Sequence, residues 1–200
     1  MPGERMGGSG QYHPTIEQRE LIADFQRPLE ELLPVARLHL DKSGETRDRW
    51  AGIAELGLFG IALSEEAGGA GLGAAEQALL AERLGRQLAS PTLIATAIAV
   101  HCDDPAIAAG VAAGEVRVAA GYRGGGKLSL LDPGDAEFVL VLESDEAVLI
   151  RIEDVEAAQG LLWASALARA DAGAPVARLD GQELRRARLI LAATLCGIAG

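Results

Sequence analysis

The 200-residue sequence is poor in the residues on which several classes of protein depend. Its two cysteines, Cys102 and Cys196, are far apart and have no CxxC spacing, so neither a disulfide framework nor a zinc site is expected. Its three histidines are scattered along the chain and do not form a ligand cluster. We therefore expect no metal, and a protein of the reducing cytoplasm.

Basic residues and long apolar runs are also scarce. The chain has 18 lysines and arginines against 29 acidic residues, a net charge of −11. Such a surface repels phosphate backbones, which excludes general nucleic-acid binding. The longest apolar runs, such as 93–100, are too short to span a membrane, so no membrane partner is expected. Residues 1–14 are Gly-rich and polar, and we expect a disordered lead-in there and not a signal peptide.

Small and branched aliphatic residues supply most of the apolar fraction. Apolar residues make up 49% of the sequence and aromatic residues only 4%. A core of alanine, leucine and valine suits closely packed helices. Between residues 16 and 40, apolar side chains recur at three- and four-residue steps, which predicts a helix that kinks or divides near Pro28 and Pro34. Further helices are predicted over 47–56, 74–88, 93–100 and 105–113, so that 15–114 forms an N-terminal helical domain.

The pattern changes after residue 114. Short runs of valine, leucine and isoleucine alternate with Gly-, Asp- and Pro-containing turns, which predicts a small antiparallel β domain over 115–179. Acidic residues crowd its middle, between 132 and 156, against Arg151 alone, and we interpret them as a solvated outer face. Strands are predicted at 116–122, 137–142, 147–152, 161–167 and 175–179.

A final helix is predicted from residue 182 onward. Asp180 followed by Glu183 is an acidic variant of the capping box. Apolar residues after it cover more than one stripe, so this helix should have neighbours on several sides. The sequence ends at Gly200, which indicates either a truncated bundle or a partner subunit that covers the helix. The expected class is α+β: a helical domain, a small β domain and, over 180–200, the start of a C-terminal helical bundle.

Several segments, in this order, resemble acyl-CoA dehydrogenases. The stretch AELGLFGIALSEEAGGAGLG (54–73) resembles the N-terminal signature of that family, and AEQALLAERLGRQLASPTLIATAIA (75–99) resembles the next two helices. The segments GEVRVAAGY (114–122), GDAEFVLVL (134–142) and RARLILAATLCGIAG (186–200) resemble the start of the β domain, a later strand and the opening of the C-terminal bundle. The resemblance covers about 15–200. The signature itself is interpreted as a tightly packed helix–loop–helix connection.

The resemblance implies a reaction, a cofactor and partners. Such enzymes desaturate a CoA thioester: a base removes the α proton while the β hydride passes to N5 of FAD. The implied partners are an acyl-CoA and further subunits of a homo- or hetero-oligomer. In the family, the helix that matches 93–99 lines the far end of the acyl pocket. Plain core is an equally good interpretation of this segment.

The flavin-facing positions depart from the family pattern. Where the family has Tyr-x-x-Thr-Glu, Arg123 and Gly124 stand in place of the Thr and Glu, and a glycine run replaces a Gly-Ser-Asp turn. Compared with the family, the Trp-containing hairpin that should follow is expected to be shortened or deleted. Trp163 could pack on a flavin ring or belong to the core. The resemblance implies these cofactor-binding positions: Ala120, Tyr122, Arg123 and Ser129.

No catalytic residue is assigned. The base of the family is a glutamate in the C-terminal bundle, beyond the segment that matches 186–200, and Glu183 is interpreted as a helix cap. Two hypotheses on function follow. The chain is an acyl-CoA dehydrogenase-like FAD protein that is incomplete as a single chain, or a non-catalytic partner subunit of a heteromeric dehydrogenase that has lost flavin binding. An unrelated helical-plus-β scaffold is a third possibility.

Overall fold

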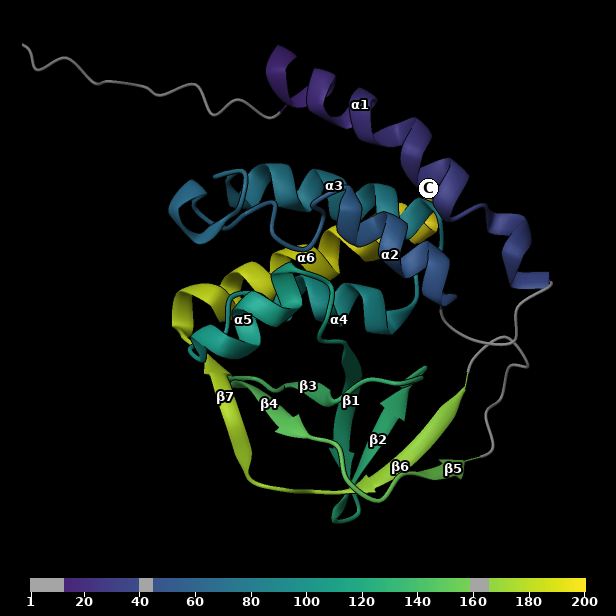
Figure 1. Ribbon diagram of the computed structural model, residues 1–200, viewed down its shortest axis with the longest axis vertical. Coiled ribbons are helices and arrows are strands. Elements are labelled where there is room, and N and C mark those ends of the chain that lie inside the picture. The colour runs from purple at the N-terminus through teal and green to yellow at the C-terminus, as the bar shows by residue number, and fades with distance from the viewer. Residues whose placement is uncertain (1–12, 40–44, 159–165) are drawn as a thin grey trace, which may run out of the picture.

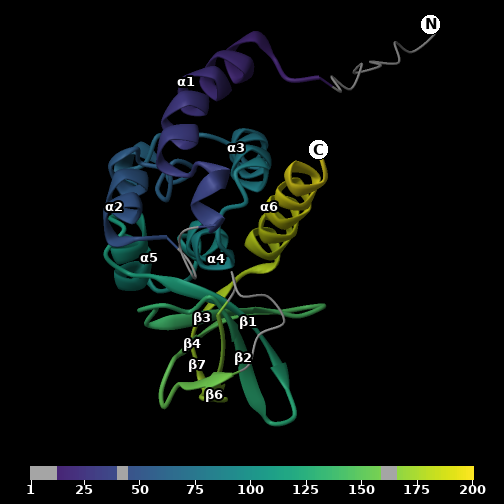
Figure 2. The same cartoon turned by 90° about the vertical axis from the view of Figure 1, so that its right-hand side faces the viewer.

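The computed structural model describes residues 13–39, 45–158 and 166–200. Figure 1 shows helices stacked on one side of a curved sheet, with α4 next to the sheet and α1 outermost, and Figure 2 shows the same order from the side. The helical elements are α1 (Ile16–Leu32), η1 (Val35–His39), α2 (Arg47–Glu55), η2 (Glu65–Ala67), α3 (Ala74–Arg86), α4 (Pro91–Ala99), α5 (Pro105–Ala112) and α6 (Gly181–Ala199). The strands are β1 (Val118–Gly124), β2 (Lys127–Leu131), β3 (Phe138–Leu142), β4 (Ala147–Arg151), β5 (Glu156–Ala158), β6 (Leu167–Asp171) and β7 (Pro175–Leu179). The predicted α+β class is confirmed.

Side-chain caps fix the starts of the helices. Thr15 and Gln18 form a complete capping box on α1, and Ser90 caps α4 just before Pro91. Asp180 accepts the Gln182 and Glu183 N–H groups at the start of α6. The chain leaves the first helix before Pro34, as predicted, but α1 continues through Pro28. Pro28 lacks a backbone N–H, but the next residue, Leu29, is only 1% exposed and its packing in the core holds the helix together.

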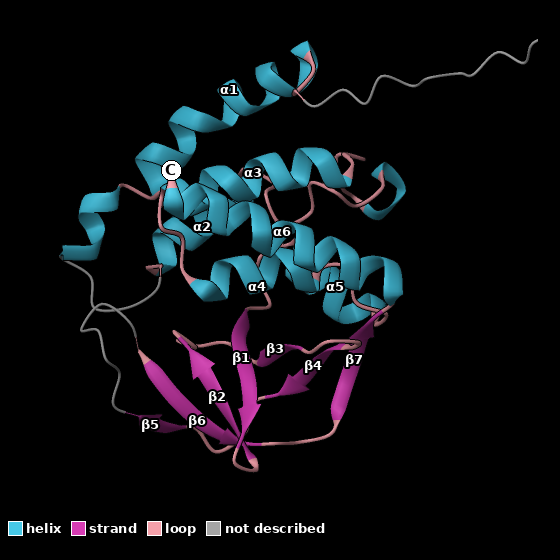
Figure 3. Cartoon of the chain, turned by 180° about the vertical axis from the view of Figure 1, so that it is seen from behind, coloured by secondary structure: helices cyan, strands magenta, loops and turns pink. Residues whose placement is uncertain are grey.

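The sheet has the order β5-β6-β2-β1-β3-β4-β7 (Figure 3). Five of its neighbouring pairs are antiparallel, as predicted, but β1 and β3 run parallel. The other edge of β2 is taken by β6, so β3 cannot continue the β1–β2 hairpin as a meander and instead lies on the free side of β1. The turn at Asp132 to Gly134, where both residues have positive φ, starts this crossing.

Two hydrophobic cores lie on the two faces of the sheet. The helix-facing core joins side chains of α3, α4 and α6 to those of the strands, among them Leu93, Ile98, Leu140 and Leu149. On the opposite face the curved sheet closes over its own aliphatic side chains: Leu128, Leu130, Val139, Val141, Val148, Ile150, Ala168 and Ala170. Helices and sheet therefore share one continuous core, and the sheet buries a second one by itself.

Two short strands, β2 and β5, are absent from the sequence prediction. Of the strand predicted at 161–167, only Ala166 and Leu167 are described: Ala166 lies outside any strand and Leu167 starts β6. Trp163 and most of the lead-in 1–14 lie outside the described residues. The sequence prediction missed β2 because the glycine run before it looks like a loop. In the structure, Gly125 and Gly126, both at positive φ, form a tight turn that connects β1 directly to β2. None of the helices in the described parts of the chain is long and apolar enough to cross a membrane.

The 54–73 segment packs as a connection between α2 and α3. Leu58, Phe59 and Ile61 are buried, while Glu65 and Glu66 stand exposed in η2. A Cβ on Gly69 would overlap the carbonyl oxygens of Gly60 and Leu63. These contacts support a structural role for the segment, with its glycine required where two stretches of backbone touch.

Candidate functional site

Two threonines on one face of α4 fasten this helix to the sheet. The Thr96 hydroxyl, which is completely buried, accepts the Val118 N–H at 2.9 Å and lies 2.8 Å from the Thr92 carbonyl oxygen. The Thr92 hydroxyl donates to the Asp132 carbonyl at 2.6 Å. α4 is thereby held across the start of β1 and the end of β2. Sequence reasoning missed both residues, although hydroxyls four residues apart in an otherwise apolar helix are a readable signal.

We expect Thr96→Val to lower the free energy of unfolding by about 1–3 kcal/mol. Valine keeps the shape of threonine, but it leaves the buried Val118 N–H without its acceptor. Urea denaturation followed by circular dichroism measures the change. Thr46→Val, at the exposed N-cap of α2, is the control for exchanging a threonine, with an expected loss of only about 1 kcal/mol. A Thr96→Val protein as stable as the parent would show that this link between α4 and β1 contributes nothing.

An apolar cavity of about 390 Å³ lies between α4, α6 and the helix-facing side of the sheet. Its walls are aliphatic: Ala89, Pro91, Ile94, Ala95, Ile98, Ala120, Gly121, Leu131, Leu140, Leu142, Leu191, Leu195 and Ile198. Among the described lining residues, only Tyr122 and Thr194 have polar side chains, and the Thr194 hydroxyl already donates to Ile190 within α6. This cavity has the size and lining of a site for an apolar ligand.

The four predicted cofactor positions separate in the structure. Ala120, Tyr122 and Ser129 share the helix-facing side of the β1–β2 hairpin, since Tyr122 pairs with Ser129 and Ala120 with Leu131. Ala120 and Tyr122 line the cavity, and Ser129 lies beside Tyr122 without lining it. Arg123 points to the other side of the hairpin.

Arg123 pairs with two carboxylates and does not line the cavity. Its guanidinium lies 3.2 Å from Glu143 and 3.3 Å from Glu146. A side chain in the next position along a strand faces the opposite side of the sheet, so Arg123 cannot reach the cavity that Tyr122 lines. The structure therefore brings together Ala120 and Tyr122 on the cavity wall and leaves Arg123 away from it.

A flavin ring does not fit the described residues on this side of β1. The ring needs hydrogen-bond partners along its polar edge, whereas the cavity floor consists of Ala120 and Gly121. The backbone of both residues is paired on one edge with β2 and on the other with β3. No described side chain other than that of Tyr122 faces the cavity from β1 with a polar group to offer.

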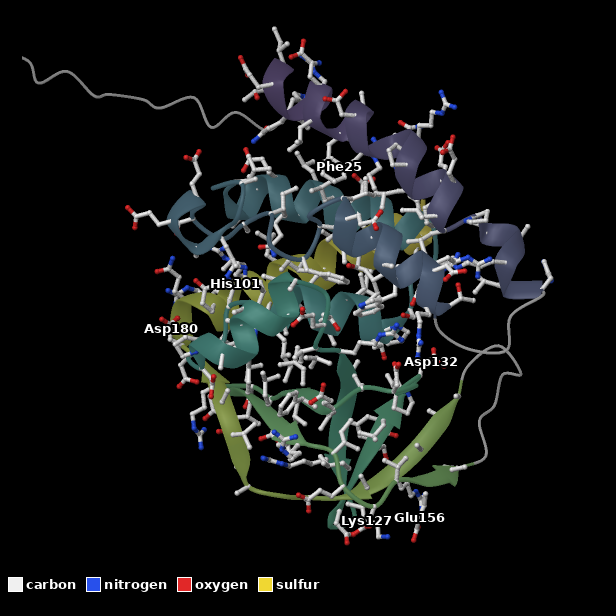
Figure 4. All side chains as sticks on the ribbon, in the orientation of Figure 1. Phe25, His101, Lys127, Asp132, Glu156 and Asp180 are labelled. Atoms are coloured by element: carbon white, nitrogen blue, oxygen red, sulfur yellow. The ribbon has the colours of Figure 1, made fainter. Side chains whose placement is uncertain are left out.

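A buried polar cluster holds the start of α6. His101, at the end of α4, has its Nδ1 3.7 Å from Glu183, and its Nε2 is 3.3 Å from both Arg186 and Gln77 (Figure 4). Burial and the neighbouring Arg186 lower the pKa of His101 to about 4, so its Nε2 is free to accept from these two donors. Burial raises the pKa of Glu183, whose carboxylate faces Arg186 at 3.0 Å. The Glu183 side chain thus belongs to this cluster, and the Asp180 side chain accepts the capping hydrogen bonds at the start of α6.

A second buried polar cluster lies at the start of α4. The Glu45 carboxylate pairs with Arg37 at 3.4 Å and accepts the Ser90 N–H at 3.0 Å. Arg37 also donates to the backbone around Leu88, whose φ is positive. Burial raises the pKa of Asp132, which accepts the N–H of residue 166. These contacts close the loops around α4. Among the described residues, no group of three or more His, Cys, Asp or Glu side chains is placed to hold a metal ion.

Comparison with known proteins agrees with this architecture. The model of the acyl-CoA dehydrogenase N-terminal domain matches residues 15–113. A variant of the Tcur3481–Tcur3483 steroid acyl-CoA dehydrogenase is similar in structure with a TM-score of 0.66, 23% identity, and coverage of 92% of this chain and 63% of that one. An acyl-CoA dehydrogenase from Geobacillus kaustophilus gives a TM-score of 0.61 at 15% identity, with 92% and 65% covered. None of the curated proteins matches in sequence.

A further structural relative is the ChsE4–ChsE5 complex from Mycobacterium tuberculosis, with a TM-score of 0.55, 15% identity, and coverage of 86% of this chain and 60% of that one. The chain thus spans less than two thirds of the length of these solved relatives. Residues 15–113 thus belong to the acyl-CoA dehydrogenase N-terminal domain family, and nearly the whole chain shares the fold of solved acyl-CoA dehydrogenases.

Proposed function

We propose that the protein binds the acyl group of a CoA thioester in the cavity between α4, α6 and β1, and that it serves α,β-desaturation of that thioester in the cytoplasm as one subunit of a heteromeric dehydrogenase. The cavity carries this proposal. Its aliphatic lining suits a hydrocarbon chain, while the charged nucleotide of CoA would remain outside. In this assembly FAD, which accepts the hydride, belongs to a second subunit.

The exposed surface of α6 supports the proposal of a partner subunit. After Arg188 every exposed residue of this helix is apolar or small, including Leu189, Leu195 and Ile198, and Figure 2 shows α6 at the edge of the helical layer. A face of this kind is typical of a helix covered by other helices. Two of the structural relatives, Tcur3481–Tcur3483 and ChsE4–ChsE5, are named as pairs of chains.

The alternative is that this chain itself binds FAD and acts as the dehydrogenase. The visible spectrum of the purified protein, alone and mixed with a complete dehydrogenase encoded nearby, separates the two. We expect a colourless protein alone, and light scattering that shows a hetero-oligomer in the mixture. A yellow protein alone would favour the alternative. A colourless protein that does not associate with the complete enzyme would contradict the heteromeric subunit.

Acyl-chain binding makes a quantitative prediction. Affinity for butanoyl-, octanoyl- and dodecanoyl-CoA should rise by up to about fourfold for each added CH₂ buried in the cavity, since burying a CH₂ contributes about 0.8 kcal/mol. Calorimetric titration measures the series. Ala120→Phe places a ring in the cavity and should lower the dodecanoyl-CoA affinity at least about tenfold, as a loss of two or more buried CH₂ groups would. Val176→Phe, on an exposed strand position, should leave it unchanged. An affinity independent of chain length would contradict this use of the cavity.

A further inference from the structure

The floor of the cavity on β1, formed by Ala120 and Gly121, carries no polar side chain. Gly124 pairs directly with Lys127, so only Gly125 and Gly126 connect the two strands, and no longer loop can fold over a ligand there. The backbone edges of Ala120 and Gly121 are paired with β2 and β3. The backbone N–H groups of these two residues are therefore engaged in the sheet and are not available to a flavin ring.

The two cations of the β1–β2 hairpin itself, Arg123 and Lys127, are engaged in ion pairs. Arg123 is paired with Glu143 and Glu146, and Lys127 lies 3.5 Å from Glu156 and 3.7 Å from Asp171. Figure 4 shows Lys127 and Glu156 together at the far end of the hairpin.

Arg188 of α6 donates to the backbone carbonyls of Glu143 and Ser144. The pyrophosphate of FAD carries two negative charges and is normally held by free cations or backbone N–H groups. In a chain with a net charge of −11, the carboxylates beside Arg123 and Lys127 make such binding less favourable still.

We infer that the cavity is a flavin-free acyl site, in which the hydrocarbon chain of the ligand lies directly on β1, against Ala120 and Gly121. The inference rests on the proposed function and specifies how the same site is used. Leu131 and Leu140, which flank Ala120 on the neighbouring strands, continue the apolar floor on both sides. An apolar chain loses nothing on a surface without donors, whereas a flavin ring would lose its hydrogen bonds to water.

Tyr122→Trp puts a fluorescent reporter at the cavity wall. With FAD absent, dodecanoyl-CoA should shift the emission of this variant to shorter wavelength, because the hydrocarbon displaces water from the ring. Val176→Trp, away from the cavity, is the matched control and should not respond. In a separate titration, the fluorescence of FAD should remain unquenched when the unmodified protein is added in excess.

The outcomes distinguish the inference from the proposed function. Quenching of FAD by the protein, or an acyl-CoA response that appears only when FAD is present, would overturn the flavin-free site and leave acyl binding intact. An absent response to acyl-CoA with and without FAD would overturn both.

A double variant, Arg123→Thr with Gly124→Glu, tests the reason for the missing flavin. These side chains match the family pattern, and no close contact prevents a Cβ at Gly124. We expect no FAD binding, because the short turn and the paired backbone remain. Tight FAD binding by the double variant would show that side chains alone were at fault and that the backbone of this hairpin accepts a flavin.

Discussion

Replacing Gly197 with alanine is expected to destabilise the protein by about 3 kcal/mol, the upper end of the range for overpacking. A Cβ on Gly197 would overlap the carbonyl oxygen of Glu82, and one on Gly85 would overlap that of Thr194. The two helices α3 and α6 therefore touch backbone to backbone, and the obstructing atoms cannot turn aside as a side chain would. To make room, α6 must move outward and draw the buried Ile190 away from the core. Urea denaturation followed by circular dichroism measures the loss.

Gly181→Ala is the matched control for this prediction. It lies in the first turn of the same helix, and the atom nearest to its added Cβ is the end of the Arg185 side chain at 3.9 Å. We expect its stability to change by less than about 1 kcal/mol, because the residue is exposed and helical. Gly197→Ala with the midpoint of the unmodified protein would mean that α6 does not cross α3 at this distance. If only Gly197→Ala lowers the free energy of unfolding, the close contact between α3 and α6 contributes strongly to the stability of the helices.

Local signals in the sequence account for most of the elements. Ser90 before Pro91, and Asp180 before an apolar run, mark helix starts because their side chains accept backbone N–H groups that would otherwise be unpaired. Valine- and leucine-rich runs bounded by turns located β3, β4 and β7 to within a few residues. These features depend on neighbours within about four residues, which is the range that a single sequence reveals.

Long-range contacts account for what the sequence did not reveal. β2 carries a lysine and a serine and follows a glycine run, and its pairing with β1 and β6 is what makes it a strand. The parallel pairing of β1 with β3 depends on which edge β6 occupies. At the site, the resemblance indicated Ala120 and Tyr122, which line the cavity. The opposite orientation of Arg123 follows from strand alternation only once the ends of β1 are known.

Acidification is expected to weaken the protein through His101. Its pKa is lowered from 6.5 to about 4 in the folded protein, so the unfolded chain binds the proton more readily. The stability due to neutral His101 is complete above pH 6.5 and is lost as the pH falls towards 4, by about 3 kcal/mol in total. Protonation removes the Nε2 acceptor from Gln77 and sets a positive charge against Arg186. The free energy of unfolding, measured by urea denaturation at a series of pH values, should fall over this range.

Other groups modify this slope, and a variant isolates the part due to His101. Burial raises the pKa of Glu183 and of Asp132, so the folded protein takes up those protons more readily and their contribution to stability grows as the pH falls. His101→Gln cannot be protonated but can still offer an oxygen to Arg186, so its stability should depend less on pH between 6.5 and 4, by most of the 3 kcal/mol. His39→Gln, at an exposed position, is the control. Equal pH dependence in His101→Gln and in the unmodified protein would show that the contact between α4 and α6 does not depend on the charge of this imidazole.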